Sequence, residues 1–253
     1  MSKIYQFLSE TTDVSRFAIR FFKDGLKPPF ETEEIIKQSF VIGYKSLPLV
    51  GITSFIMGLV LTIQSRPTLV EFGAESWLPS MVAISIIREI GPVITALICA
   101  GKIGSSIGAE LGSMKVTEQI DAMEVSGTNP FKFLVATRII ATTLMLPLLV
   151  ILSDAIGIFG SYLAVNIKDT VSFTLFFNQV FDSLSFSDVI PAIIKTFFFG
   201  FAIGLIGCYK GYHSDKGTQG VGRSANSAVV VASLLVFVLD LIAVQIADLF
   251  YEL

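Results

Sequence analysis

Long apolar stretches alternate with short polar ones along this chain. A membrane-spanning helix needs about 20 mostly apolar residues. Five stretches meet this requirement, at residues 46–64, 78–101, 133–165, 189–208 and 228–250. They lack the two-residue alternation that is typical of strands in a membrane barrel. The pattern therefore predicts an all-α integral membrane protein, with about five transmembrane helices in a domain formed by residues 46–253.

A different pattern precedes the first span, within residues 1–45. Apolar residues recur near helical spacing as far as Phe22, with basic residues between them. This is typical of an amphipathic helix that lies in the cytoplasmic membrane interface, or of one that packs on the surface of a partner. A second short helix is expected to begin at Thr32, because Thr is a suitable N-cap and Glu33 and Glu34 follow it in the first turn.

The distribution of Lys and Arg predicts the orientation of the spans. If the N-terminus is cytoplasmic, the cytoplasmic segments hold thirteen of these residues and the outer segments hold two, Arg66 and Lys168. The positive-inside rule then places the N-terminus in the cytoplasm and the C-terminus outside it.

Composition narrows the function classes. Of the 253 residues, 53% are hydrophobic and 15% are charged, whereas a soluble domain has about 25% charged residues. The net charge of −3 gives no basic surface to suggest nucleic acid as a partner. The cysteines, Cys99 and Cys208, lack metal-site spacing and the single His213 has no companion ligands, so we expect no metal site.

The loop after the second span carries a row of small residues. Gly104, Gly108 and Gly112 follow one another at four-residue spacing. In a membrane helix this spacing allows two backbones to approach closely, although glycine can also simply loosen a helix end. We expect the row to be a helix-packing surface.

A short helix is expected next, at about residues 114–125. Val116, Ile120 and Met123 share one face of it, and Gly127 is placed as its C-cap. Such a helix between two spans is either a solvated connector or a plug that fits a groove on a soluble partner. The helical pattern alone leaves both interpretations open.

Three runs of this sequence resemble the MlaE-type permeases, the membrane subunits of MCE-linked ABC transporters of bacterial phospholipids. The runs are PLVGITSFIMGLVLTIQ, IIREIGPVITALICAGKIGSSIGAELGSMKVTEQIDAMEV and GYHSDKGTQGVGRSANSAVV. The resemblance implies a homodimer in the bacterial cytoplasmic membrane, with two cytoplasmic ATPase subunits and an extracytoplasmic MCE-domain protein. It further implies that the 114–125 helix couples to the ATPase through Glu110, Met114, Val116, Glu118, Ile120 and Met123.

Charges within the apolar stretches are candidate functional residues. Arg88 and Glu89 lie near the middle of the second span, where an unpaired charge costs at least about 2.5 kcal/mol. They either form interhelical salt bridges, with Asp240 as a partner for Arg88, or face a hydrated cavity in which Arg88 binds a lipid phosphate. We expect a structural or gating role for Lys195 and Asp240. Asp154 is a residue at which this chain departs from many members of the resembled family.

An apolar wall for acyl chains is expected around the outer end of the first span. Leu61, Leu69 and Trp77 are candidates for this wall, and Gln64 is a polar candidate at the same level. Together with Arg88 and Glu89 they form the predicted lipid-binding set.

The chain lacks features that would supply its own energy or covalent chemistry. It contains no G-x-x-x-x-G-K-[ST] motif, so ATP is expected on a partner subunit and no cofactor on this one. With a single histidine in a loop we expect no catalytic residues. The alternative functions are a secondary transporter or channel, which would favour internal repeats, and an intramembrane enzyme or assembly factor.

Overall fold

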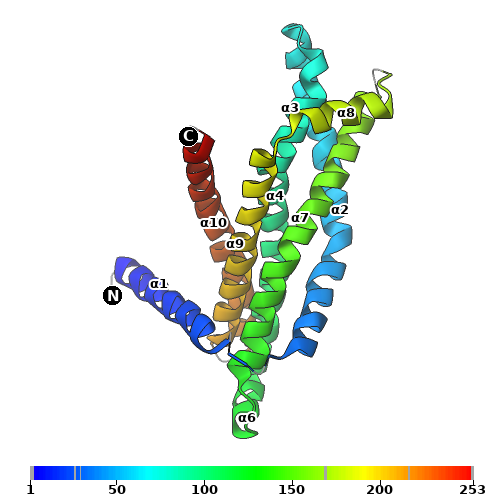
Figure 1. Ribbon diagram of the computed structural model, residues 1–253. Helices are drawn as coiled ribbons and strands as arrows, with labels where there is room; N and C mark the ends of the chain where they lie inside the picture. The colour runs from blue at the N-terminus through cyan, green and yellow to red at the C-terminus, as the bar shows by residue number, and fades with distance from the viewer. Residues whose placement is uncertain (1–2, 26, 29, 168–169, 216, 252–253) are drawn as a thin grey trace. The chain divides into compact units, whose positions relative to one another are not determined.

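The fold is all-helical in a computed structural model that describes residues 3–25, 27–28, 30–167, 170–215 and 217–251. No strand occurs in these residues, and the predicted all-α membrane fold is confirmed. Figure 1 shows the helices with their labels. In chain order they are α1 (Lys3–Arg20), η1 (Phe21–Gly25), α2 (Thr32–Glu71), η2 (Glu75–Trp77), α3 (Leu78–Ser85), η3 (Ile86–Ile90), α4 (Gly91–Cys99), η4 (Ala100–Gly104), α5 (Ser105–Val116), α6 (Gln119–Val125), η5 (Phe131–Ala136), α7 (Thr137–Val165), α8 (Phe173–Ser183), α9 (Phe186–Tyr212) and α10 (Thr218–Tyr251).

Five helical segments in the described residues are long and apolar enough to cross a membrane, as predicted. All five are longer than expected from hydropathy, because each helix continues into its polar flanks. They are Thr32–Glu71, Glu75–Val116, Phe131–Val165, Phe186–Tyr212 and Thr218–Asp248.

The separate short helix expected at Thr32 does not exist, because α2 is one helix of 40 residues from Thr32 to Glu71. At about 1.5 Å per residue it is about 60 Å long, twice the hydrocarbon thickness of a bilayer. Pro48 and Pro67 lie inside it without ending it. Prolines are tolerated in membrane helices when neighbouring groups satisfy the backbone that they free.

The chain forms two compact units. Unit 1 consists of residues 1–42, 99–145 and 200–236, and unit 2 of residues 43–98, 146–199 and 237–253. Unit 1 therefore contains α1, α5 and α6, whereas unit 2 contains α3, α4 and α8, apart from the last residue of α4. The other long helices contribute to both.

Unit 1 is held together by close contacts between glycine-bearing helices. A Cβ placed on Gly108 would lie 3.3 Å from the Ala225 Cα atom of α10. Helix α9 also approaches Gly108 closely, because a Cβ on Gly211 would lie 2.9 Å from the Gly108 carbonyl oxygen. A Cβ on Gly104 would lie 3.8 Å from Ile203, and one on Gly112 would lie 2.8 Å from the Ser224 hydroxyl. The row of three glycines thus faces α9 and α10 of the same chain.

The amphipathic helix α1 packs on its own unit at its C-terminal end. Phe17 is buried and its ring contacts Phe131, Tyr209, Tyr212 and His213 edge-on or tilted, at centroid distances of 5.1–6.1 Å. Leu8 and Ile19 remain exposed, whereas Val14 and Ala18 are partly buried. The exposed Leu8 and Ile19 lie on a helix that also carries basic residues, and its position in the membrane interface stays a prediction.

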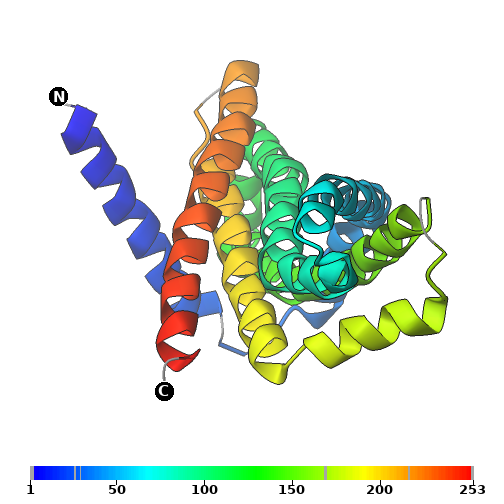
Figure 2. The same ribbon diagram turned by 90° about the horizontal axis from the view of Figure 1, so that it is seen from above.

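Unit 2 contains a helix that was not predicted. In Figures 1 and 2, α8 lies across the direction of α3 and α4. It buries Phe176 and Val180, and Ser80 of α3 donates a hydrogen bond to the Gln179 carbonyl oxygen at 3.3 Å. The sequence did carry a signal for it, because Phe173, Phe176, Phe177 and Val180 recur at helical spacing.

Candidate functional site

An ionic cluster lies within unit 2 and joins three helical segments. The Lys195 ammonium group of α9 donates hydrogen bonds of 2.8 Å to Glu89 Oε2 of η3 and of 2.8 Å to Asp240 Oδ1 of α10. The lysine side chain is only 5% exposed, whereas Glu89 is 46% exposed and Asp240 18%. One cation thus satisfies two carboxylates, which gives the buried charge the pairing that an apolar environment demands.

Arg88 points to a different partner from the one considered for it. Its Nε lies 3.6 Å from Asp188 Oδ1, near the start of α9, and Asp240 belongs to Lys195 instead. The pairing with Asp240 predicted as the alternative role of Arg88 is therefore wrong. Adjacent residues on a helix point in different directions, so Arg88 and Glu89 meet different partners. Asp188 was missed by the sequence analysis, because it lies one residue before the apolar stretch 189–208.

Two cavities border this cluster. The first has a volume of about 550 Å³ and is lined mostly by apolar residues of α9 and α10, together with Ser187 and Lys195. The second, the polar cavity, is small, about 40 Å³; it is lined by apolar residues and by the charged residues Arg88, Glu89, Asp188, Lys195 and Asp248. Apolar and charged walls thus meet at Lys195, which is an arrangement suited to an amphipathic ligand.

The predicted acyl-chain wall lies elsewhere in unit 2. Leu61 and Leu69 pack against the buried cluster that includes Leu78 and Phe176. Gln64 and Trp77 are exposed. The polar cavity that Arg88 lines contains none of these four residues. Of the predicted lipid-binding set, Arg88 and Glu89 therefore line one cavity. Leu61, Gln64, Leu69 and Trp77 do not line it.

Asp154 of α7 has a distinct environment in unit 2. Its Oδ1 is buried, has no hydrogen-bond partner among the described residues and occupies the place where a Cβ on Gly91 would lie. Gly91 follows the π-helical turn η3 that carries Arg88 and Glu89. The carboxyl group thus requires glycine at position 91.

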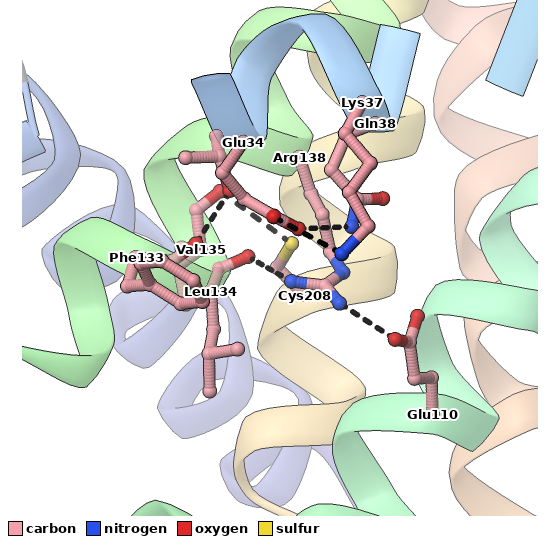
Figure 3. A network of polar contacts seen from close by, with 10 residues as sticks. Glu34, Lys37, Gln38, Glu110, Phe133, Leu134, Val135, Arg138 and Cys208 are labelled. Carbon is pink, nitrogen blue, oxygen red and sulfur yellow. Dashed lines mark hydrogen bonds and ion pairs between the residues drawn. The ribbon is translucent and has the colours of Figure 1, made fainter. Parts of the chain in front are cut away.

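Unit 1 contains its own buried cation, which the sequence analysis did not single out. Arg138 is 2% exposed; its Nη2 donates to Glu110 Oε1 and its Nη1 to the Leu134 carbonyl oxygen, each at 2.8 Å. Figure 3 shows this arrangement, with Glu34, Lys37 and Gln38 of α2 nearby. Glu110, predicted to couple to an ATPase, is engaged here by a residue of its own chain.

The segment 114–125 is not one helix, contrary to expectation. Helix α5 ends at Val116 and α6 begins at Gln119, because Glu118 adopts a left-handed conformation with φ of 58°. A salt bridge of 2.9 Å between Lys115 and Asp121 spans this corner. Met114 and Val116 thus belong to the end of the long helix, and Ile120 and Met123 to the short one.

The corner also turns the predicted apolar face inward. Ile120 is 1% exposed, Met123 is half-buried, and the exposed apolar residue of α6 is Val125 at 91%. The predicted C-cap is confirmed: Gly127 has φ of 82°, its amide donates to Glu124, and the Thr128 amide donates to Met123. This is the Schellman arrangement of a helix end. The described residues contain no group of three or more His, Cys, Asp or Glu side chains placed to hold a metal ion.

Comparison with known proteins assigns this arrangement to a family. A model described as "Permease MlaE" matches residues 35–246. The chain belongs to the MlaE permease family. It is 42% identical over 238 residues to an ABC transporter permease protein of Rickettsia prowazekii, covering 94% of this chain and 91% of the relative. It is 37% identical over 214 residues to the intermembrane phospholipid transport system permease protein MlaE of Haemophilus influenzae, covering 84% and 82%.

The same family reaches beyond these bacteria. An ABC transporter permease protein of Synechocystis is 36% identical over 229 residues, covering 88% of this chain and 87% of the relative. The matched region contains the ionic cluster, the glycine row and the α5–α6 corner. The resemblance seen in the sequence is therefore confirmed, and the chain is a multi-pass membrane protein of the MlaE permease family.

Proposed function

We propose that this MlaE-family chain is the permease subunit of an ABC transporter that moves phospholipid, or a related lipid, between bacterial membranes. The observation that carries this proposal is the family match over residues 35–246, together with a relative that is named for intermembrane phospholipid transport. In this proposal the chain is located in the cytoplasmic membrane, and its N-terminus lies in the cytoplasm. The subunit performs transport and no enzymatic reaction of its own.

The proposal includes three partners. A second copy of the chain would complete the permease, two cytoplasmic ABC ATPase subunits would supply energy, and an extracytoplasmic MCE-domain protein would exchange lipid. The absence of an ATP-binding motif in the sequence supports an external ATPase. Exposed apolar residues along α10, such as Leu234, Phe237 and Leu241, support a helix face that either lipid or a second copy covers.

In this proposal the α5–α6 corner contacts the ATPase. The corner exposes Glu118, Asp121, Glu124 and Val125 and is braced by the Lys115–Asp121 salt bridge. A braced corner transmits a push from the partner into α5, because its two helices cannot hinge freely. Met114, Val116, Ile120 and Met123 would then support the corner from inside rather than meet the partner.

Arg88 would hold the lipid phosphate. Its side chain is 38% exposed and lines the polar cavity next to the apolar groove between α9 and α10. A guanidinium group can give a phosphate two parallel hydrogen bonds. Asp188, 3.6 Å away, would orient the arginine, while Lys195 remains committed to Glu89 and Asp240.

The test measures the phospholipid that co-purifies with each variant. Arg88→Ala should keep its fold and retain less phospholipid, and Arg88→Lys should retain an intermediate amount because it keeps the charge but loses the fork. Arg66→Ala is the matched control, since Arg66 also belongs to unit 2 and pairs with a carboxylate, that of Glu75. It should retain as much as the wild type.

A second pair of variants separates lipid binding from structure. If Arg88 served only to neutralise Asp188, Arg88→Ala would destabilise the protein and adding Asp188→Ala would restore it. A stable Arg88→Ala variant with wild-type lipid content and transport would remove Arg88 from the lipid site. Failure of the protein to co-purify with any P-loop ATPase would contradict the transporter assignment itself.

A further inference from the structure

A second large cavity of unit 2 lies on another side of α9 and takes no part in the proposed phosphate site. Its volume is about 380 Å³, within the range of about 300–1,000 Å³ common for small-molecule sites. It is enclosed by η3, α7, α8 and α9. Twelve of its thirteen lining residues are apolar, and the remaining one is Asp154.

Asp154 is the one ionisable residue among the described residues that line this cavity. Glu89 and Asp240 both share the ammonium group of Lys195, whereas Asp154 has no hydrogen bond or ion pair with any described residue. Its Oδ1 is held against Gly91, and the accessible part of the side chain lines the cavity. A carboxyl group in apolar surroundings is costly unless it meets a hydrogen-bond donor. The described residues do not supply a donor to this carboxyl group, and its accessible part can accept a hydrogen bond from a ligand that enters the cavity.

Two apolar residues that line the cavity are exposed on the surface of unit 2. Ile151 of α7 and Phe181 of α8 line it and are 48% and 69% exposed. A protein helix, about 10–12 Å wide with its side chains, is too bulky for such a space, whereas a single hydrocarbon chain is not. The described lining residues include no cation that could pair with an anionic headgroup. The expected occupant thus has three properties: a single hydrocarbon chain, no negative charge and a hydrogen-bond donor.

We propose that this cavity binds a neutral single-chain lipid with a free hydroxyl group, whose chain lies between α7, α8 and α9 and whose hydroxyl donates to Asp154. A long-chain alcohol and a monoacylglycerol share this chemistry. The site goes beyond the proposed transport function, because binding here requires only the folded protein in a membrane.

The experiment uses photoactivatable probes on the full-length protein in phospholipid nanodiscs. The probes are a long-chain alcohol, a monoacylglycerol and the methyl ether of the alcohol, which has the same chain without a donor. Cross-linked peptides are identified by mass spectrometry. The alcohol or the monoacylglycerol should label peptides of α7 and α8, and the stronger of the two identifies the source of the hydroxyl. The ether should label them about three- to tenfold less, the factor expected for one hydrogen bond.

Variants then test the cavity and the carboxyl group separately. Asp154→Ala should lower labelling by the alcohol to the level of the ether, and Asp154→Asn should preserve it because the amide keeps an acceptor oxygen. Ala155→Phe should block labelling by filling the cavity, whereas Leu152→Phe, an exposed residue of α7 that does not line it, should not.

Equal labelling by the alcohol and the ether would overturn the proposal, because the carboxyl would then not recognise a donor. Labelling of α7 and α8 that Ala155→Phe leaves unchanged would also overturn it, since the probe would be resting on an ordinary lipid-facing surface. Neither result depends on ATPase activity or on lipid at Arg88, so the fate of the transport proposal is measured independently.

Discussion

Among the described residues, each unit of this protein buries one cation, and the two are satisfied in different ways. Lys195 in unit 2 donates to two carboxylates and borders two cavities. Arg138 in unit 1 donates to one carboxylate and one backbone carbonyl, and its buried Nε has no partner among the described residues. Both cations are almost inaccessible, at 5% and 2% exposure.

The difference lies in the surroundings. Arg138 belongs to the unit in which Gly108 and Gly211 bring helices into backbone contact, so its role is compatible with fixed packing. Lys195 belongs to the unit with the large cavities, where charged and apolar walls meet. Burial of a charge therefore does not by itself identify a functional site; accessible space beside the charge is the better guide.

The largest effect is expected from Lys195→Met. It leaves the Glu89 and Asp240 carboxylates close together without their shared cation, and loss of one partner of a buried ion pair costs about 3–5 kcal/mol. Thermal unfolding in detergent should show a large drop in stability. A triple variant that adds Glu89→Gln and Asp240→Asn should recover most of it.

Arg138→Met sharpens the same comparison and should cost less, about 1–3 kcal/mol. The carboxylate that it leaves, Glu110, is 51% exposed and can be hydrated, whereas Asp240 beside Lys195 is only 18% exposed. If Lys195→Met and Arg138→Met lower the free energy of unfolding equally, the exposure of the carboxylates does not distinguish the two units.

Gly108→Leu tests the packing of unit 1 and should destabilise the protein by about 1–3 kcal/mol, the usual cost of overpacking. A side chain there would meet the backbone of α10 at 3.3 Å. Gly101→Leu is the matched control, because a Cβ on Gly101 meets no atom within 4 Å. If the two variants unfold at the same temperature, the glycine row is not a close contact.

Two substitutions in α6 separate support of the corner from contact with the ATPase. Ile120→Asp should unfold the corner and lower stability, because Ile120 is buried. Val125→Asp should leave the melting temperature unchanged and weaken co-purification of the ATPase subunit, because Val125 is 91% exposed. Normal assembly and transport with Val125→Asp would exclude this residue from the partner contact.

The last prediction concerns the orientation of the chain in the membrane, and no change in stability is expected. Single cysteines at Thr170 and Glu124, both exposed, are introduced into a variant in which the buried Cys99 and Cys208 are replaced by Ala. A membrane-impermeant maleimide added from outside should label Thr170→Cys and not Glu124→Cys. The reverse result would invert the topology derived from the Lys and Arg distribution.

Local patterns were sufficient for the features that depend on local physics. Apolar runs of membrane-spanning length predicted five spans, and Gly127 was correctly placed at the end of α6. The left-handed Glu118 was not predictable, because the Lys115–Asp121 salt bridge and the burial of Ile120 hold a conformation that its own sequence does not favour. Helix α8 was missed although its aromatic spacing was visible, because its 11 residues are too few for a span.

What the sequence determined by itself is the solvent and the family: long apolar runs require a lipid environment, and the motif around the second span identifies an MlaE permease. Only the tertiary structure decided which charges meet. Three separate stretches of the chain supply the charges: Arg88 and Glu89, then Asp188 and Lys195, then Asp240. Hydropathy marks each of them as equally costly in a membrane. The approach of η3, α9 and α10 paired Lys195 with two carboxylates and Arg88 with Asp188, and it left Asp154 without a partner from the described residues. Pairing depends on distances across helices, and a one-dimensional pattern does not contain them.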